Sequence, residues 1–600
     1  MWGLLQFATA FLSSILYPFT ILVFSLQEEL SLNNEFVINF ENFGFKYNAQ
    51  AEPTLYNIDF KIKKGEKVLI AGPSGCGKST IAHCINGLIP NSYPGTATGS
   101  LTIGGRNALK LNLFELSKTV GTVLQDSDGQ FIGLTVAEDI AFALENDCIP
   151  TPEMHKEVQR IAELVDIERV LHSAPHEISG GQKQRVGLGG VMVGDIDVLL
   201  FDEPLANLDP ATGKQAIALI DDIQKRTGCA VIIIEHRLED VLYRNVDRIV
   251  VMGDGRIEFD GTPDELLSAD LLQDKGIREP LYVTALKYAG VKITPDMRPS
   301  YLPELKLSKE QKEQVRVWFS RQPEALAEEK SEIVFQAENL DFTYDNGHHA
   351  LHNLNIKVHK GEMLSIVGTN GAGKTTFSKV ICGFEKPQKG MMKMGTTDLS
   401  TLSIKERADH IGYVMQNPNQ MISKVKIFDE VALGLRNRGV SEDEIKGRVE
   451  ETLKVCGLYP FRNWPISALS YGQKKRVTIA SILVLNPEII ILDEPTAGQD
   501  LRHYTEIMDF LSELNKQGVT VILITHDMHL MLEYTQRAVV FHDGEIIADK
   551  TSAEVLNSPE IVEKAHLKET SLYHLSEMCG ISPAEEFTRR FIARDREVRK

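Results

Sequence analysis

The sequence predicts an α/β protein made of two homologous domains in tandem, and two repeated features lead to this fold class. A glycine-rich segment occurs twice, as "GPSGCGKST" over 72–80 and "GTNGAGKTT" over 368–376. Each copy follows a short apolar run and precedes an apolar-periodic segment, an order typical of strand, loop and helix. A second apolar run that ends in acids also recurs, as "VLLFDEP" from Val198 and "IIILDEP" from Ile489. Such runs are typical of buried parallel strands.

The spacing between repeated motifs supports a duplication. Gln125 lies 54 positions before Ser179, and Gln416 lies 54 positions before Ser470. The next step, to the glutamate of each "DEP", is 24 positions in both copies. Chance matches do not keep such distances, so internal repetition is the simplest reading. We expect a hydrophobic N-terminal extension (1–30), a first domain (35–269), a linker or small accessory segment (270–330), a second domain (332–555) and a helical C-terminal tail (556–600).

The composition of the chain limits which kinds of molecule it can bind. The formal net charge is -19, which argues against nucleic acid, since a phosphate backbone needs a basic face. The same acidity opposes direct adsorption to anionic lipid, so a membrane association should go through another protein. The 7 cysteines include no CxxC pair, which disfavours zinc or iron–sulfur ligation and indicates reduced thiols.

The N-terminal segment 1–27 contains no charged residue. As a helix it would extend roughly 39 Å, long enough to span a bilayer. A signal peptide is disfavoured because the segment has no Lys or Arg at its start and no clear small-residue cleavage site. A membrane anchor and an extension outside the working fold both remain open.

The glycine-rich loops indicate phosphate binding. Glycines let backbone N–H groups approach phosphates closely, and the following helix N-terminus adds partial positive charge. Lys78 and Lys374 are expected to reach the β- and γ-phosphates, while Ser79 and Thr375 ligate Mg²⁺. An ordinary glycine-rich turn is the alternative, but two copies after apolar runs argue against it.

The acids of the second motif complete a hydrolytic site. Asp202 and Asp493 end apolar strands and fit carboxylates linked to Mg²⁺. Glu203 and Glu494 follow them, and each can polarise an attacking water, a role that contributes about 10²–10⁴-fold. Exposed acids at the end of a strand are the alternative.

Two further pairs keep their distance from these motifs. His236 and His526 end the next apolar run and are candidates to hold the γ-phosphate and the water. Tyr47 and Tyr344 precede the two lysines by 31 and 30 positions and are candidates to stack on adenine. A structural histidine and an ordinary strand tyrosine are the alternatives.

Two similar decapeptides, "EISGGQKQRV" and "ALSYGQKKRV", indicate a particular family of nucleotide hydrolases. With "SGGQ" after a glycine loop and before "DEP", the chain resembles the ATP-binding cassette (ABC) ATPases over about 35–549, apart from the linker. The resemblance implies, in each domain, a RecA-like parallel-sheet core of the P-loop NTPase type, an antiparallel β subdomain and a helical subdomain that carries the signature. It also implies head-to-tail pairing, with Lys78 facing Ser470 and Lys374 facing Ser179 within one chain.

The resemblance extends to further residues. Asp209 and Asp500 match the loop that couples the two sites, and Gln125 and Gln416 match a catalytic glutamine that also ligates Mg²⁺. The implied cofactors are ATP and Mg²⁺. The implied ATP contacts are Tyr47, Gly72, Pro73, Ser74, Gly75, Cys76, Gly77, Lys78, Ser79, Thr80, Tyr344, Gly368, Thr369, Asn370, Gly371, Ala372, Gly373, Lys374, Thr375, Thr376, Ser179, Gly180, Gly181, Gln182, Ser470, Gly472 and Gln473.

Tyr471 interrupts the second signature where the first has a glycine. A tyrosine costs little there if its φ is negative and would be strained if φ were positive. We predict a negative φ and a working second site, since both domains keep their Lys, Asp, Glu and His.

The segments after the two glutamines, "QDSDGQFIGLTVAEDIAFALEN" and "QNPNQMISKVKIFDEVALGLRN", resemble those of energy-coupling-factor importers. This similarity implies a transmembrane coupling protein and a substrate-binding membrane protein as partners, at the cytoplasmic face of the membrane. Glu138, Asp139, Asp429 and Glu430 are candidates to meet arginines of that partner, or they form solvated acidic helix faces. Two fused cassettes also resemble the ATPase of a hydroxymethylpyrimidine/thiamine-type importer, and the group as a whole takes up vitamins and metal ions.

Three other classes compete. A cassette-type translation factor on the ribosome usually has a long basic linker, whereas the linker here is nearly balanced in charge. The tandem ATPase of a sugar importer often has a degenerate second site, whereas both cassettes here keep their motif residues. DNA-repair cassettes carry zinc cysteines or long coiled coils, and the sequence shows neither pattern.

Overall fold

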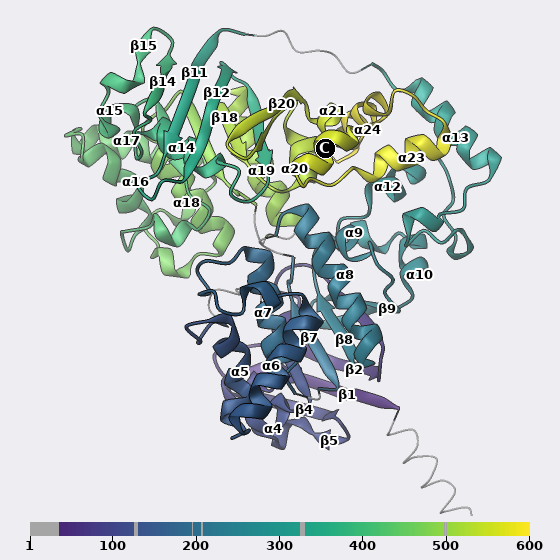
Figure 1. Ribbon diagram of the computed structural model, residues 1–600. Helices are drawn as coiled ribbons and strands as arrows, with labels where there is room; N and C mark the ends of the chain where they lie inside the picture. The colour runs from purple at the N-terminus through teal and green to yellow at the C-terminus, as the bar shows by residue number, and fades with distance from the viewer. Residues whose placement is uncertain are drawn as a thin grey trace, which may run out of the picture. The chain divides into compact units, whose positions relative to one another are not determined.

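The computed structural model describes residues 35–124, 130–194, 196–205, 208–324, 331–496, 499 and 501–599 (Figure 1). The chain divides into two compact units. One comprises Met1–Leu205 with Ala216–Ile277, and the other Ala206–Gln215 with Arg278–Lys600.

The first unit is built on a six-stranded sheet in the order β10-β9-β3-β8-β7-β6. All pairs are parallel except the hairpin β9–β10. Asp254 (φ 45) and Gly255 (φ 73) form its turn, which requires left-handed backbone. The strands are β3 (Lys67–Ala71), β6 (Val120–Val123), β7 (Val198–Asp202), β8 (Ala230–Ile234), β9 (Arg248–Gly253) and β10 (Arg256–Gly261).

A second, antiparallel sheet in the order β2-β1-β4-β5 packs its apolar side chains against the same core. Phe40, Phe43 and Phe45 are fully buried and belong to one cluster with the central strands β3, β7 and β8. This sheet therefore supports the loop that precedes α2. Its strands are β1 (Phe36–Tyr47), β2 (Leu55–Lys63), β4 (Gly95–Ile103) and β5 (Arg106–Asn107).

Helices α5, α6 and α7 pack on one another and form the helical part of the first cassette. Side-chain caps begin α5 at Thr135 and α7 at Ser179. The helices of this cassette are α2 (Lys78–Ile85), α3 (Leu88–Asn91), α4 (Leu113–Ser117), α5 (Val136–Asn146), α6 (Thr151–Val165), α7 (Gly180–Val191), α8 (Pro210–Thr227), α9 (Leu238–Val241), α10 (Pro263–Ser268) and α11 (Leu271–Asp274).

The second unit repeats this plan. Its sheets run β16-β17-β18-β13-β19-β20 and β12-β11-β14-β15. The strands are β11 (Ile333–Thr343), β12 (His349–His359), β13 (Met363–Gly368), β14 (Lys389–Met394), β15 (Thr397–Asp398), β16 (Ile411–Val414), β17 (Ile489–Asp493), β18 (Thr520–Ile524), β19 (Arg537–His542) and β20 (Glu545–Thr551). The helices are α14 (Lys374–Cys382), α15 (Ile404–Arg407), α16 (Ile427–Arg436), α17 (Glu442–Val455), α18 (Tyr471–Leu483), α19 (Leu501–Lys516) and α20 (Met528–Tyr534).

The predicted α/β fold of two tandem cassettes is therefore confirmed. Both central sheets have five parallel strands and one antiparallel edge strand. Their strands are nearly continuous apolar runs because both faces are covered.

Accessory helices complete the second unit. Figure 1 shows the C-terminal helices, in yellow, beside α12 and α13 of the segment between the cassettes, and these helices are in contact. Trp318, Phe319, Phe587 and Phe591 pack at their junction. The accessory helices are α12 (Leu281–Tyr288), α13 (Lys309–Arg321), α21 (Ser552–Leu556), α22 (Pro559–Lys564), α23 (Ser571–Cys579) and α24 (Ala584–Val598).

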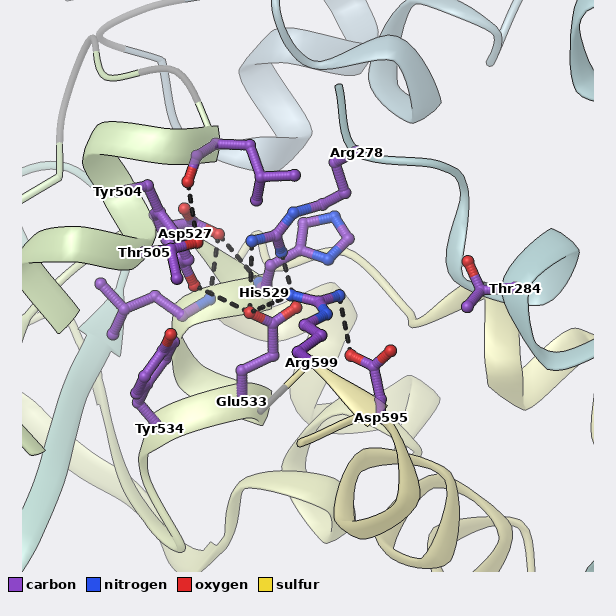
Figure 2. Close-up of polar contacts among 12 residues, drawn as sticks. Arg278, Thr284, Tyr504, Thr505, Asp527, His529, Glu533, Tyr534, Asp595 and Arg599 are labelled. Atoms are coloured by element: carbon purple, nitrogen blue, oxygen red, sulfur yellow. Dashed lines mark hydrogen bonds and ion pairs between the residues drawn. The ribbon is translucent and has the colours of Figure 1, made fainter. Parts of the chain in front are cut away.

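An ion-pair network centred on the buried Glu533 ties the accessory helices to the second cassette (Figure 2). The Glu533 carboxylate accepts two hydrogen bonds from Arg278, at 2.8 and 3.2 Å, and one from the Tyr504 hydroxyl at 3.3 Å. Arg599 lies 3.5 Å from the same carboxylate and 2.7 Å from Asp595. Segments from three parts of the sequence thus share one carboxylate.

Among the helices that the structure describes, none is long and apolar enough to cross a bilayer. Residues 1–34, which contain the predicted extension, lie outside the described part, so both readings of that segment stay predictions.

Candidate functional site

Both glycine-rich loops have the backbone that a phosphate cradle needs. Gly75 (φ 78) and Gly371 (φ 81) have left-handed backbone, and a Cβ added at either would meet nothing within 4 Å. At Gly77 and Gly373, by contrast, a Cβ would lie 2.8 Å from Leu55 and 2.6 Å from the Ala350 carbonyl. The open side of each loop, next to a helix N-terminus, is where an anion fits.

Each loop lysine is buried and turned onto its own loop. The Lys78 ammonium donates to the carbonyls of Gly72 (2.7 Å) and Pro73 (2.8 Å). Lys374 donates to the carbonyl groups of Gly368 and Thr369 at 2.9 and 2.7 Å. The two lysines therefore hold the same position in the two cassettes, directly at the phosphate cradle.

Carboxylates converge on the same place from the sheet. Burial, with Glu203 alongside, raises the pKa of Asp202 to about 6. Burial likewise raises the pKa of Asp493, whose Oδ2 accepts from the Tyr413 hydroxyl at 2.9 Å and lies 3.5 Å from the Thr375 hydroxyl. A buried carboxylate beside a hydroxyl is a donor set of hard oxygens, which fits Mg²⁺.

The structure brings each catalytic glutamate candidate to its histidine. The distance from His236 Nε2 to Glu203 Oε1 is 2.7 Å, and from His526 Nε2 to Glu494 Oε1 it is 3.4 Å. Both glutamates have positive φ, 49° and 43°, which is uncommon for a residue with a side chain and is often found at functional sites. Burial, and next to it the charge of Asp493, raises the pKa of Glu494.

The two candidate adenine-stacking tyrosines lie against the loop helices. The Tyr47 hydroxyl is 3.1 Å from the Thr80 hydroxyl, and the Tyr344 hydroxyl is 3.0 Å from that of Thr376. Each ring is half-buried, and His348 lies nearly parallel to the Tyr344 ring, with the centroids 6.3 Å apart.

Both signature serines begin a helix. Ser179 caps α7 and Ser470 caps α18, each by a capping box. Tyr471 is the first residue of α18 and is not among the residues with positive φ, so the predicted negative φ is confirmed. Asp209 is buried and accepts from the Thr212 amide and hydroxyl, both at 2.9 Å. Gln125 and Asp500 lie outside the described residues.

The four helix acids have local hydrogen-bond or ion-pair partners in the structure. Asp139 and Glu430 each accept hydrogen bonds from two backbone amides of the loop just before the helix, and Glu430 is buried. Glu138 belongs to the capping box of α5, and Asp429 lies 3.1 Å from Arg436. Their placement as arginine-binding groups is wrong for Glu430, because its carboxylate holds the loop rather than facing outward.

Apolar side chains are exposed beside these acids. Leu134 is 81% exposed and Val425 is 76% exposed. Each precedes the cassette's α5 or α16 by two positions, and the offset of 291 between them is the offset between Ser179 and Ser470. The structure thus presents the same apolar feature at the same place in both cassettes.

Sequence reasoning missed two buried residues at the sites. Glu235 is 3% exposed and accepts from the amides of Leu205 (3.2 Å) and His236 (3.0 Å). Burial raises the pKa of Glu235. Lys475, fully buried in α18, donates to the carbonyls of Met415 and Gln416. The sequence did offer one signal, because each residue differs from the one at the same position of the other cassette. Thr525 corresponds to Glu235, and Gln184 corresponds to Lys475.

Comparisons with known proteins agree with this geometry. The ABC transporter family model matches residues 55–206 and 351–497, and a family described as ATP-binding cassette cobalt transporter matches 269–342. An ABC transporter ATP-binding protein of Enterococcus faecalis is 57% identical over 565 residues, which cover 94% of this chain and 99% of the relative. One from Clostridium perfringens is 57% identical over 563 residues, with the same coverage.

Among solved structures, cbiO1 from Clostridium perfringens, described as part of the ABC transporter complex cbiONQ, is 34% identical. It covers 41% of this chain and 100% of its own, with a TM-score of 0.37. The duplicated site and the full-length relatives lead to one conclusion: the chain belongs to the ABC transporter ATP-binding proteins and is an ATPase with two cassettes.

Proposed function

We propose that this ATPase energises a membrane importer of the energy-coupling-factor type, at the cytoplasmic face of the membrane. Its partners are a transmembrane coupling protein and a substrate-binding membrane protein. The imported molecule is a transition-metal ion or a vitamin-related compound such as a thiamine precursor.

The observation that carries the membrane partner is the matched pair Leu134 and Val425. Contiguous exposed apolar patches commonly mark interaction sites, whereas single exposed apolar residues are ordinary, so what singles out this pair is its recurrence. Here the recurrence is at the same position of each cassette, before the helix whose sequence resembles importer ATPases. A partner with two similar apolar docking elements fits that arrangement better than a ribosome, which offers phosphate to a basic face.

ATP hydrolysis in this proposal uses composite sites. Lys78 holds the phosphates of one ATP and the Ser470 end of α18 closes over it, while Lys374 and Ser179 do so for the other. Ser79, Asp202 and Gln125 would hold Mg²⁺ in the first site, and Thr375, Asp493 and Gln416 in the second. Mg²⁺ supplies charge neutralisation on the phosphate oxygens.

The protein's own groups then activate water. Glu203 or Glu494 accepts the water proton, and His236 or His526, already within contact of that glutamate, orients it. The signature serine hydroxyl and the N-terminus of its helix face the transferring phosphoryl group, whose negative charge they stabilise.

A docking experiment tests the membrane partner. The double variant Leu134→Glu/Val425→Glu places charge where an apolar contact is proposed, and Ile404→Glu, at another exposed apolar residue, serves as the matched control. Pull-down from solubilised membranes should recover small hydrophobic proteins with the wild-type chain and the control, but not with the double variant. Recovery of ribosomes instead would favour the translation-factor class, and unchanged recovery by the double variant would remove the docking role.

A second experiment tests head-to-tail pairing. In a Glu494→Gln chain only the site with Lys78 and Glu203 remains active. Adding Ser470→Ala should lower the remaining ATP turnover strongly, whereas adding Ser179→Ala should not. The opposite result would mean that each signature serves its own cassette.

The match of 269–342 to a cobalt transporter family supports the metal-ion branch over the thiamine branch. Uptake of radiolabelled Co²⁺ and of labelled thiamine, in cells with and without this chain, decides between them. Dependence of neither uptake on the chain would point to another substrate, such as a sugar.

A further inference from the structure

The first turn of α18 is fastened to the loop that carries Gln416. The Tyr471 hydroxyl donates to the Gln416 carbonyl at 3.2 Å. Lys475 donates to the same carbonyl at 3.0 Å and to that of Met415 at 2.7 Å. Tyr471 and Lys475 lie four positions apart on a helix and therefore on one face, so both reach one stretch of backbone.

Burying the Lys475 ammonium costs free energy unless the ammonium is hydrogen-bonded. Lys475 is 0% exposed, and burial lowers its pKa to about 8, although Asp493 and Glu494 favour its charged form. A buried ammonium needs hydrogen-bond acceptors, and Lys475 finds them in two backbone carbonyls of the Gln416 loop. Moving that loop away would leave the ammonium without them, so helix and loop are expected to move together.

The first cassette holds its signature helix differently. The positions that correspond to Tyr471 and Lys475 are Gly180, which has no side chain, and Gln184. The Gln184 amide donates at 2.8 Å to the carbonyl of Pro204, directly after Glu203. The signature helix of the first cassette is therefore hydrogen-bonded to the segment that follows Glu203. The residue types that make this contact differ from those in the second cassette.

We propose that Tyr471 and Lys475 are positioning residues that fix the Ser470 signature and the Gln416 loop as one rigid body. This clamp, the Tyr471–Lys475 contact with the 415–416 backbone, explains why a tyrosine is accepted in the second signature. The inference rests on the proposed pairing in one respect: Ser470 then serves the site of Lys78, while Gln416 serves the site of Lys374. The clamp links the two ATP sites through one cassette.

The test uses chains in which a single site hydrolyses ATP. Glu494→Gln leaves the site completed by Ser470, and Glu203→Gln leaves the site that contains Gln416. Tyr471→Phe removes one hydroxyl, and Lys475→Gln introduces the residue of the first cassette. We expect kcat to fall in both backgrounds, about fivefold for Tyr471→Phe and tenfold or more for Lys475→Gln, with KM for ATP nearly unchanged.

A loss in the Glu494→Gln background alone would mean that the pair only caps the signature helix, and a loss in the Glu203→Gln background alone that it only supports Gln416. Either result, or no loss, overturns the proposal. Lys474→Met, a neighbouring lysine that lies 3.5 Å from Asn419, is the control and should retain its rate. Thermal unfolding of each variant shows that the chain is folded. The Ser470→Ala experiment above reports on the pairing independently, so the two failures can be told apart.

Discussion

The two cassettes carry the same candidate catalytic side chains but hold them in different surroundings. In the first, His236 contacts Glu203 at 2.7 Å, and the buried Glu235 accepts from the His236 amide. In the second, Thr525 takes the place of that buried acid and its hydroxyl lies 3.4 Å from Glu494. A motif therefore identifies the chemistry, while the neighbours of the motif set the charge at each site.

The two strand-end aspartates, candidate ligands that are proposed to hold Mg²⁺, differ in the same way. Asp493 accepts a hydrogen bond from Tyr413, whereas the position that corresponds to Tyr413 in the first cassette is Thr122. Asp202 instead has Glu203 and Glu235 among the charges that raise its pKa. The first site thus concentrates negative charge, and the second distributes it among hydroxyl donors.

The largest expected effect comes from the glutamates. Glu203→Gln and Glu494→Gln should each lower turnover at their own site by about 10²–10⁴-fold, because a general base is lost. Each single variant should keep part of the wild-type rate of phosphate release, and the double variant almost none. A single variant with the full wild-type rate would show that its site is silent, and the comparison would become one of a working and an idle cassette.

The accessory helices are the next point of difference. Glu533 on α20 binds Arg278 and lies near Arg599, whereas the position that corresponds to it in the first cassette is Tyr243 (Figure 2). Glu533→Ala leaves Arg278 buried without its carboxylate and should destabilise the second unit by about 3–5 kcal/mol. Glu513→Ala, which removes an exposed pair with Lys516, should cost about 0–1 kcal/mol.

Urea unfolding of the two variants measures this difference. The first unit's transition should stay where it is in both proteins. An unchanged second transition in Glu533→Ala would mean that apolar packing around Phe587 and Trp318 holds the accessory helices without the ion pair.

Whether a residue's role could be predicted from the sequence depends on how far along the chain its partners lie. The glycine loops, the parallel strands and the Glu–His pairs were predictable, since each motif carries its chemistry within a few residues. Lys475 was not, because its acceptor lies 59 positions away and is a backbone carbonyl. Glu430 of α16 was misplaced for a related reason: it looks like a surface charge in sequence, but it is buried and its carboxylate accepts from the amides of the preceding loop.

A smaller effect separates the two strand-end aspartates. The folded-state pKa of Asp202 lies above its ordinary value, so the folded protein binds this proton more tightly and the free energy of unfolding falls as pH rises from about 4 to about 6. At neutral pH the charge therefore costs stability. Asp202→Asn should raise the nucleotide-free stability of the first unit by about 1–3 kcal/mol. Asp493→Asn should gain less, since Tyr413 already stabilises that carboxylate.

Thermal unfolding measures the stability of each variant, once without nucleotide and once with Mg²⁺ and ATP. The nucleotide-free gain should be accompanied by a loss of the stabilisation that Mg²⁺ and ATP provide. If Asp493→Asn gained as much as Asp202→Asn, the hydrogen bond from Tyr413 would not distinguish the two sites.

The smallest expected effect concerns the two tyrosines, where the cassettes agree most closely. Tyr47→Phe and Tyr344→Phe each remove a hydroxyl that contacts a threonine of the loop helix, at 3.1 and 3.0 Å, and leave the ring. One such hydrogen bond contributes about 0.5–1.5 kcal/mol, so nucleotide affinity should weaken by at most about tenfold and equally in both cassettes. Binding of a fluorescent ATP analogue measures this. A larger loss in one cassette would mean that the hydroxyl there, rather than the ring, recognises the base, and the two sites would then differ in their nucleotide preference as well as in their charge.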